Sequence, residues 1–204
     1  MPVSSTGAKA GSVRSRRAPH PLALFFKGFV KHPAMVGSVI PSSRALVDHV
    51  LAPVDWSRAR VFVEYGPGVG TFTAPILDRL APDAVLIAVE LNPDFVRHLC
   101  DTIDDPRLTV VRGSAADIGR ILADLGHERA DYILSGLPFS TLPEGVGDRI
   151  AAETAAALRP DGAFLVYQLS ARVSDFIAPH FPRIERGFEW RNVPPMRIFR
   201  ARLT

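Results

Sequence analysis

Cysteine is nearly absent from this sequence of 204 residues, and long apolar runs are missing. The single cysteine, Cys100, has no partner for a disulfide within the chain, so we expect a protein of the reducing cytoplasm. No apolar run reaches the roughly 20 residues that a membrane-spanning helix requires. Hydrophobic residues still make up 47% of the chain, which is enough for one globular domain with a core of its own.

Acidic residues are absent from the first 47 positions. Seven lysines and arginines precede Asp48, whereas the whole chain carries +3, so the remainder carries −4. A basic segment on an acidic body is typical of proteins that bind an anionic surface, either nucleic acid or lipid. Residues 1–20 are rich in Ser, Gly, Arg and Ala and are predicted to form a disordered basic tail. A solvated tail without a partner is the alternative interpretation.

The segment "PLALFFKGFVKHP", residues 21–33, has the pattern of an amphipathic helix bounded by two prolines. At 100° per residue, five apolar side chains share one face and two lysines lie on the other: Leu22, Phe25, Phe26, Phe29 and Val30 against Lys27 and Lys31. A secretory signal is excluded because Lys27 interrupts the apolar run and no cleavage site follows. A second helix is predicted in "PSSRALVDHVL", with Ser42 or Ser43 as its N-cap.

From Arg60 onward, apolar strands alternate with amphipathic helices. Strands are predicted at 60–66, 84–90, 108–113, 130–136 and 162–170, and helices at 71–80, 93–103, 117–125 and 145–158. Near-continuous apolar strands in this alternation predict a mostly parallel sheet covered on both faces. Segments 183–192 and 197–203 are too close for a helical crossover, so they are predicted to form an antiparallel hairpin at the sheet edge. The predicted fold is therefore α/β and Rossmann-like, with seven strands. Its predicted parts are the tail 1–20, membrane-contacting helices 21–54 and a domain 55–204.

The stretch "VEYGPGVGTFT" joins the first strand to a helix through Gly66, Gly68 and Gly70. Glycines at such a turn let a ligand lie directly on the backbone. The spacing differs from that of dinucleotide binders, and the lysine of a triphosphate-binding loop is missing. Glu64 precedes the glycines, and Glu90 ends the second strand, where a carboxylate can accept hydrogen bonds from both hydroxyls of a ribose. The alternative interpretation is that the glycines form only a tight turn between strand and helix and bind no ligand.

This pattern, Glu-x-Gly-x-Gly-x-Gly followed by Glu90, resembles the class I S-adenosylmethionine-dependent methyltransferases. The resemblance implies that Glu64 helps to hold the methionine end of the cofactor and that the loop "GSAAD" reaches its adenine. Many members have Asp where this chain has Ser114. By resemblance, the candidate cofactor-binding residues are Ser38, Glu64, Gly66, Gly68, Gly70, Thr71, Glu90, Leu91, Ser114, Ala115 and Ser135.

The end of the fourth strand reads "SGLPFSTLP" and is expected to contact the methyl acceptor. By resemblance, Leu137, Pro138 and Phe139 match the last three positions of a motif of amino-methylating enzymes. The first position, usually Asn in the rRNA adenine dimethyltransferases, aligns with Gly136. Without that amide a nucleobase amine loses its expected partner, so no nucleic acid substrate is expected. RNA adenine N6-methylation is kept as the alternative.

Further side chains are candidates for binding an alkylamine and its lipid. Aromatic faces accommodate a methylated ammonium, which makes Phe139 and Tyr167 candidates, with core packing as the alternative for Tyr167. His180 is a candidate base. A lipid phosphate requires a cation, for which the candidates are Arg183, Arg186, Arg191 and Arg197, and also His180. The candidate catalytic residues are Gly136, Leu137, Pro138, Phe139, Tyr167 and His180.

From about residue 25 onward, the chain resembles the bacterial phospholipid N-methyltransferases. The similar segments are "HPAMVGSVIPSSRAL", "EYGPGVGTFT", "GSAAD", "SGLPFSTLP" and "NVPPMRIFR". The resemblance implies conversion of phosphatidylethanolamine, through mono- and dimethyl forms, to phosphatidylcholine, and a loop at 37–43 that closes over the methionine end of the cofactor.

A lipid substrate would explain the amphipathic segment, because an enzyme that acts on a lipid headgroup must reach the membrane surface. Residues 14–33 are predicted to contact an anionic membrane surface, with packing of the phenylalanines on the protein core as the alternative. We therefore expect a cytoplasmic monomer that is peripheral on the inner face of the cell membrane.

Overall fold

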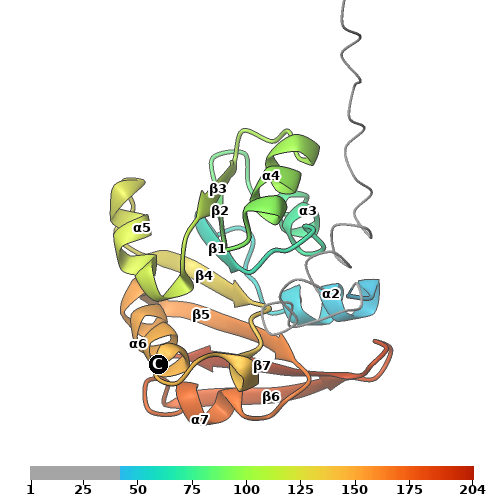
Figure 1. Cartoon of the computed structure of the whole chain (residues 1–204), viewed down its shortest axis with the longest axis vertical. Helices are drawn as coiled ribbons and strands as arrows, with labels where there is room; N and C mark the ends of the chain where they lie inside the picture. The colour runs from blue at the N-terminus through green and yellow to red at the C-terminus, as the bar shows by residue number, and fades with distance from the viewer. Residues whose placement is uncertain (1–41) are drawn as a thin grey trace, which may run out of the picture.

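The computed structural model describes residues 42–204 (Figure 1). Predictions for the tail, for residues 14–33 and for Ser38 lie outside the described residues. Seven strands form one sheet in the order β3-β2-β1-β4-β5-β7-β6. The strands are β1 (Val61–Tyr65), β2 (Val85–Glu90), β3 (Leu108–Arg112), β4 (Ala130–Ser135), β5 (Leu158–Gln168), β6 (Arg183–Glu189) and β7 (Met196–Arg202).

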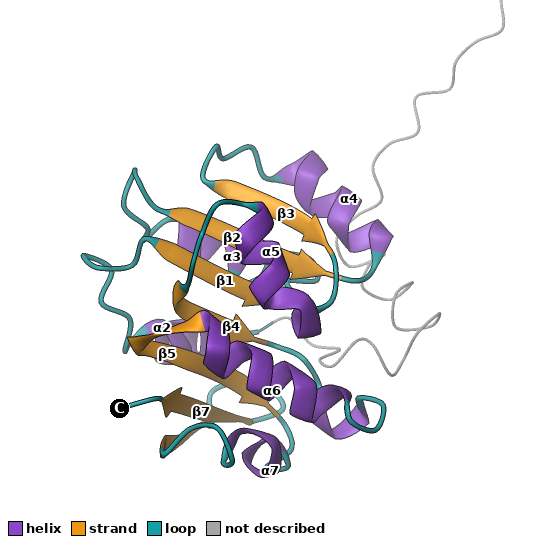
Figure 2. Ribbon diagram, turned by 90° about the vertical axis from the view of Figure 1, so that its left-hand side faces the viewer, coloured by secondary structure: helices purple, strands orange, loops and turns teal. Residues whose placement is uncertain are grey.

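Helices cover both faces of the sheet (Figure 2). They are α2 (Arg44–Leu51), α3 (Thr73–Leu77), α4 (Pro93–Thr102), η1 (Ala115–Asp117), α5 (Ile118–Asp124), η2 (Phe139–Thr141), α6 (Val146–Ala157) and α7 (Val173–Ile177). Apolar side chains of α5, α6 and α7 form one core cluster with one face of the strands, and those of α2 and α3 form another with the opposite face. Every residue of β1 and β4 is buried, because helices lie on both sides of them.

The topology confirms the predicted sheet and its edge hairpin. The strands β1 to β5 pair in parallel, whereas β7 pairs antiparallel with both β5 and β6. The strand β7 therefore lies between β5 and the edge strand β6. The short elements α7 and η2 were not predicted. The parallel strands end at one edge of the sheet, called here the carboxyl edge, where ligands of open α/β sheets bind.

The helix α2 begins after Ser43, as predicted. The side chain of Ser43 accepts a hydrogen bond from the backbone N–H of Leu46 at 3.2 Å, which caps the helix. The backbone N–H of Ser43 donates to Oδ1 of Asn192 at 2.7 Å, beyond the end of β6. Figure 1 shows α2 beside the tip of the β6–β7 hairpin. Within residues 42–204, no helix is both long and apolar enough to cross a membrane.

Candidate active site at the carboxyl edge

The glycine turn between β1 and α3 requires glycine at three positions. Gly66, Gly68 and Gly70 have φ angles of 66°, 57° and 87°, in the left-handed region that other residues rarely adopt. A Cβ on Gly66 would lie 2.9 Å from Cδ2 of Leu137, so this loop packs tightly against the end of β4. A Cβ on Gly68 would meet no atom of residues 42–204 within 4 Å. The backbone at Gly68 is therefore open to the close approach of a ligand.

Glu64 is a buried carboxylic acid at the end of β1. Its side chain accepts a hydrogen bond from the hydroxyl of Thr73 at 2.7 Å, and the residue is 3% exposed. Burial raises the pKa of Glu64 to about 7; the Thr73 hydrogen bond opposes this rise, and the charge of Glu90 adds to it. Neither of these neighbours is a cation. A buried acid in this setting fits a positively charged ligand group, such as the ammonium or sulfonium of S-adenosylmethionine.

Glu90, at the end of β2, is fixed by backbone donors. Its Oε1 accepts from the N–H of Asn92 at 2.9 Å and its Oε2 from the N–H of Gly68 at 3.2 Å. Burial raises the pKa of Glu90, and these hydrogen bonds oppose the rise. Each oxygen keeps a further lone pair, so the carboxylate can still accept hydrogen bonds from ribose hydroxyls. Leu91, next along the chain, is 51% exposed and offers an apolar surface beside it.

The loop after β3 lies next to Glu90 because the N–H of Gly113 donates to the Glu90 carbonyl at 3.1 Å. The hydroxyl of Ser114 accepts from the N–H of Ala116 at 3.2 Å and so caps η1. That hydroxyl can still donate its own hydrogen to a ligand. Ala115 is buried. The predicted adenine loop is thus at the correct edge, and its contact with the cofactor stays a prediction.

The end of β4 is held in place by two hydrogen bonds that backbone N–H groups donate. The N–H of Gly136 donates to the carbonyl of Tyr65 at 3.2 Å. The hydroxyl of Ser135, which is fully buried, accepts from the N–H of Leu137 at 3.2 Å. Ser135 therefore positions the segment from Gly136 to Pro138, next to the glycine turn.

Tyr167 projects from β5 into the same region. Its ring stacks on Phe72, with centroids 4.5 Å apart, and its hydroxyl hydrogen-bonds the side chain of Ser42. A Cβ on Gly136 would lie only 2.5 Å from that hydroxyl. Burial, with the charge of Glu64, raises the pKa of Tyr167, so the hydroxyl stays protonated. Tyr167 thus brings a neutral hydroxyl between Glu64 and Gly136.

Two predicted residues are placed differently from the expectation. Phe139 is 1% exposed and packs on Phe176, with ring centroids 5.7 Å apart, so its face is part of the core rather than open to a substrate. His180 precedes β6. Because β6 runs parallel to β5, its first residues lie at the edge opposite the carboxyl edge. The structure therefore does not bring His180 to the site. Thr71 lies in the glycine turn, partly exposed.

Sequence reasoning missed several side chains at this edge. Thr73 and Phe72 support Glu64 and Tyr167, and both lie in "TFT" directly after the glycines. Gln168 ends β5, is 5% exposed, and neither of its amide atoms has a hydrogen-bond partner among the described residues. A buried amide without a partner is costly unless a ligand satisfies it. The signal in the sequence is that Gln168 is a polar residue at the end of a predicted parallel strand, where ligands of such sheets bind.

The chain is similar to several curated methyltransferases, while no protein-family model matches it. It is 34% identical over 174 residues to the ornithine lipid N-methyltransferase of Singulisphaera acidiphila, which covers 84% of this chain and 91% of that protein. It is 40% identical over 55 residues to the ribosomal RNA small subunit methyltransferase A of Burkholderia cenocepacia, which covers 26% of this chain and 20% of that protein.

Solved structures of methyltransferases share the fold. The precorrin-6y C5,15-methyltransferase of Geobacter metallireducens superimposes with a TM-score of 0.64 at 17% identity, covering 79% of this chain and 89% of that one. TrmN of Thermus thermophilus gives 0.59 at 17% identity, over 78% of this chain and 48% of that one. These similarities confirm the predicted Rossmann-like fold of class I methyltransferases.

Proposed function

Since this chain belongs to the same family as the ornithine lipid N-methyltransferase, within the class I S-adenosylmethionine-dependent methyltransferases, we propose that it methylates the amine of a membrane lipid headgroup. The observation that carries the proposal is the 34% identity with that lipid enzyme over 84% of this chain. The substrate predicted from the sequence is phosphatidylethanolamine, converted stepwise to phosphatidylcholine. Ornithine lipid, which the name of the relative specifies, presents an amine as well.

The residues at the carboxyl edge fit the cofactor of this family. S-adenosylmethionine, when bound, supplies a methyl group activated by a sulfonium. Glu64 is the buried acid that would compensate positive charge at the methionine end, and Glu90 would accept hydrogen bonds from the ribose hydroxyls. The open backbone at Gly68 permits the close approach that such a ligand requires.

The acceptor must be a neutral amine held in line with the methyl carbon at about 3 Å. An alkylamine has a pKa of about 10 and is mostly protonated in water, but a neighbouring cation favours its neutral form. With S-adenosylmethionine bound, the neutral amine nitrogen would accept the methyl group, and the electron pair of the broken carbon–sulfur bond would remain on sulfur. A proton then leaves the new ammonium.

Two groups of the described chain are placed to orient this amine. Gly136 directly follows β4 beside the glycine turn, and the hydroxyl of Tyr167 occupies the space where a Cβ of Gly136 would lie. The hydroxyl oxygen can accept a hydrogen bond from an amine N–H and so direct the lone pair. Tyr167 would thus supply the polar partner that an asparagine at position 136 supplies in the resembling rRNA enzymes.

The test is methyl transfer from radiolabelled S-adenosylmethionine to vesicles in two arms, one with phosphatidylethanolamine and one with ornithine lipid. Lipid products are separated by thin-layer chromatography. We expect labelled lipid in at least one arm. The lipid that becomes labelled identifies the headgroup that the enzyme methylates. Glu128→Gln, an exposed glutamate far from the site, is the matched control and should behave as the unmodified protein. Unlabelled lipid in both arms, despite measurable cofactor binding, would overturn the proposal.

RNA adenine methylation is the second candidate. The similarity to the rRNA methyltransferases A extends over 55 residues in one relative and 98 in another, 20% and 35% of those proteins. Gly136 also lacks the amide expected to hold a nucleobase amine. Methyl incorporation into adenine of added RNA, together with blank lipid arms, would favour this candidate instead.

A further inference from the structure

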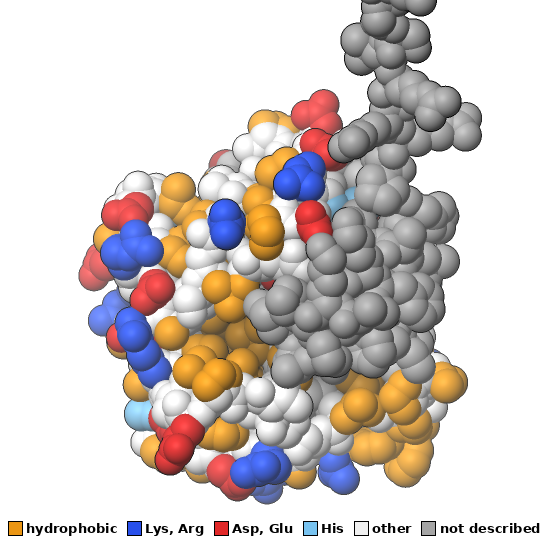
Figure 3. All heavy atoms as spheres, viewed as in Figure 1, with side chains coloured by type: hydrophobic (Ala, Val, Ile, Leu, Met, Phe, Trp, Pro, Cys, Tyr) orange, Lys and Arg blue, Asp and Glu red, His pale blue; other side chains and the backbone are white. Residues whose placement is uncertain are grey.

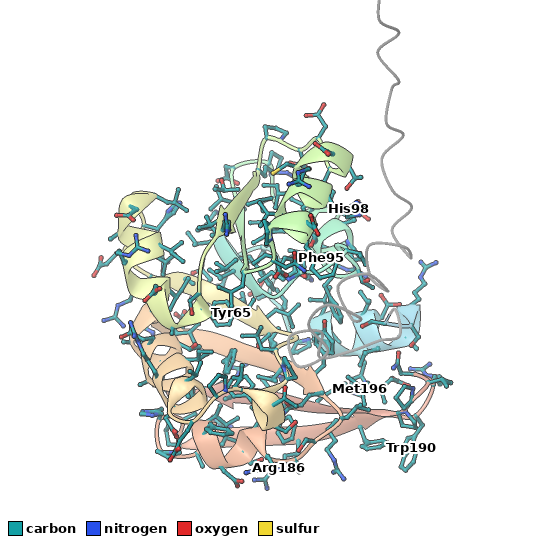
Figure 4. All side chains as sticks on the ribbon, viewed as in Figure 1. Tyr65, Phe95, His98, Arg186, Trp190 and Met196 are labelled. Carbon is teal, nitrogen blue, oxygen red and sulfur yellow. The ribbon has the colours of Figure 1, made fainter. Side chains whose placement is uncertain are left out.

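The tip of the β6–β7 hairpin, residues 190–195, exposes large apolar side chains. Trp190 is 74% exposed and Val193 is 73% exposed, the highest values among the large hydrophobic residues of the described chain. The Trp190 ring contacts that of Phe188, with centroids 4.2 Å apart. Figure 3 shows hydrophobic side chains gathered at this corner of the molecule, and Figure 4 shows Trp190 at the outer end of the hairpin. Such an exposed patch usually marks an interaction site.

The hairpin that carries this tip is strongly basic. Residues 183–202 contain six arginines and two glutamates, a net charge of +4. Residues 42–182 contain twelve arginines and 19 acidic residues, a net charge of −7. Four of the hairpin arginines are exposed: Arg183 at the start of β6, and Arg186, Arg191 and Arg197 further towards the tip. The guanidinium of Arg197 lies 5.6 Å from the centre of the Phe188 ring. The apolar tip is therefore framed by cations on an otherwise acidic body.

The sheet register places this tip at the carboxyl edge. Arg197 of β7 pairs with Gln168, the last residue of β5, and also with Phe188 of β6. Residues between Phe188 and Arg197 therefore extend beyond the end of β5. The glycine turn and Gly136 lie at this same edge, so a surface that contacts the tip also faces the candidate active site.

The tip is fixed rather than free to swing. Asn192 is 2% exposed; its Oδ1 accepts from the N–H of Ser43, and its Nδ2 donates to the carbonyl of Pro194 at 2.8 Å. Glu189 accepts from the Arg191 guanidinium at 2.9 Å and hydrogen-bonds the His49 ring at 3.0 Å. These contacts join the tip to α2, so the orientation of the tip also sets the orientation of the whole domain.

We propose that this tip inserts Trp190 and Val193 into the interface of an anionic lipid bilayer, with Arg186 and Arg197 on the lipid headgroups. Tryptophan favours the membrane–water interface, where its apolar ring and polar N–H are both satisfied, and arginines beside it bind anionic headgroups. Seated in this way, the carboxyl edge faces the bilayer. This contact is separate from the one predicted for residues 14–33, and its purpose rests on the proposed lipid substrate.

Tryptophan fluorescence tests the insertion directly, because the chain has only two tryptophans. Trp56, the other one, stacks on Phe62 at a centroid distance of 5.8 Å, away from the tip. In full-length Trp56→Phe, the remaining Trp190 should show blue-shifted emission with vesicles containing phosphatidylglycerol and should be quenched by brominated lipid. The matched variant Trp190→Phe, which keeps Trp56, should show neither change. Binding to vesicles with unshifted, unquenched Trp190 emission would overturn the proposal, as would no binding at all.

Substitution of the two arginines tests the electrostatic contribution to membrane binding. Arg186→Gln and Arg197→Gln should each weaken partitioning to anionic vesicles about fivefold, as expected for one cation at such a surface. Arg129→Gln, an exposed arginine directly before β4 and so at the edge opposite the carboxyl edge, should leave partitioning unchanged. Equal partitioning of all three variants would contradict the proposed orientation.

The outcome is distinguishable from that of the proposed function. Quenching of Trp190 in a protein that methylates no lipid would leave the membrane contact standing and remove the proposed substrate. Methylation of detergent-solubilised lipid by a protein whose Trp190 is not quenched would support the proposed substrate and exclude the proposed membrane contact of the tip.

Discussion

The hydroxyl of Tyr167 lies where a side chain at position 136 would have to be. A Cβ built on Gly136 would be 2.5 Å from that hydroxyl and 2.9 Å from Cζ of the same ring, both shorter than real Cβ contacts. The absence of a side chain on Gly136 and the presence of Tyr167 are therefore linked: the space that a side chain at position 136 would need is filled by a hydroxyl that arrives from β5.

Gly136→Ala is expected to cost about 1–3 kcal/mol of unfolding free energy, the usual cost of overpacking. The φ of Gly136 is outside the left-handed region, so the cost arises from the contact with Tyr167 and not from backbone strain. Adding Tyr167→Phe removes the 2.5 Å contact but keeps the ring, so part of this cost should be recovered. Urea unfolding of the two single variants and the double variant measures the coupling.

Gly119→Ala is the matched control for this cycle. A Cβ on Gly119 would have its nearest contact at 3.5 Å, an ordinary distance, and the residue lies within α5. Alanine there should be neutral or stabilise the protein by up to about 1 kcal/mol. Additive effects of Gly136→Ala and Tyr167→Phe would show that the two residues do not compete for one space.

Tyr167→Phe alone should lower kcat/KM about tenfold, which corresponds to about 1.4 kcal/mol for one lost hydrogen bond. The affinity for S-adenosylmethionine should stay the same, because the hydroxyl is expected to contact the acceptor amine. Tyr132→Phe is the control: the Tyr132 hydroxyl accepts from the N–H of Asp55 at 3.0 Å, near the start of β4. It should lower stability without lowering activity. A loss of activity in Tyr132→Phe but not in Tyr167→Phe would exclude the role assigned to Tyr167.

The sheet could be predicted from the sequence because its signals are local. The run Val61–Tyr65 is apolar except for Glu64, and it forms a wholly buried strand. Ser43 directly precedes α2 and caps that helix, as expected. The glycine turn was likewise found from spacing, since its three positive φ angles need residues that stand close together.

Features that depend on distant contacts could not be predicted. The short η2 turn returns the Phe139 ring to the core, and no pattern in "GLPF" distinguishes this from a ring exposed to substrate. The Gly136–Tyr167 contact joins the residue after β4 to a residue of β5, so it depends on the pairing of two distant segments, whereas the sequence indicates only that Tyr167 is near a strand end. His180 was proposed from its chemistry alone, whereas the strand direction of β6 decides its position.

Glu90→Gln should weaken cofactor binding about 10- to 100-fold, because hydrogen bonds to an ionised carboxylate contribute about 1.5–3 kcal/mol. The amide keeps one acceptor oxygen, so the backbone contacts with Gly68 and Asn92 are partly preserved. Calorimetric titration with S-adenosylhomocysteine measures the effect, with Glu128→Gln as the control. An analogue without the ribose hydroxyls should bind the variant and the unmodified protein alike. A similar loss for that analogue would place Glu90 away from the ribose.

Glu64 predicts how stability changes with pH in the protein without cofactor. Its folded pKa of about 7 exceeds the usual value of 4.5, so between these values the folded state binds more protons than the unfolded state. The contribution of Glu64 to the free energy of unfolding should therefore be largest below pH 4.5. It should fall as the pH rises to 7 and stay level above pH 7. The loss amounts to about 3 kcal/mol, because one unit of pKa corresponds to about 1.4 kcal/mol.

Glu64→Gln removes this dependence and tests its cause. The variant should be more stable than the unmodified protein at pH 8 in urea unfolding, and the two should converge near pH 5. It should also bind S-adenosylmethionine more weakly and lose the gain in affinity that the unmodified protein shows as Glu64 ionises towards pH 7. Glu144→Gln, an exposed glutamate, should keep both pH dependences. If Glu64→Gln were instead less stable at pH 8 and bound the cofactor normally, the carboxylate would be a structural partner of Thr73 and not a charge held for the cofactor.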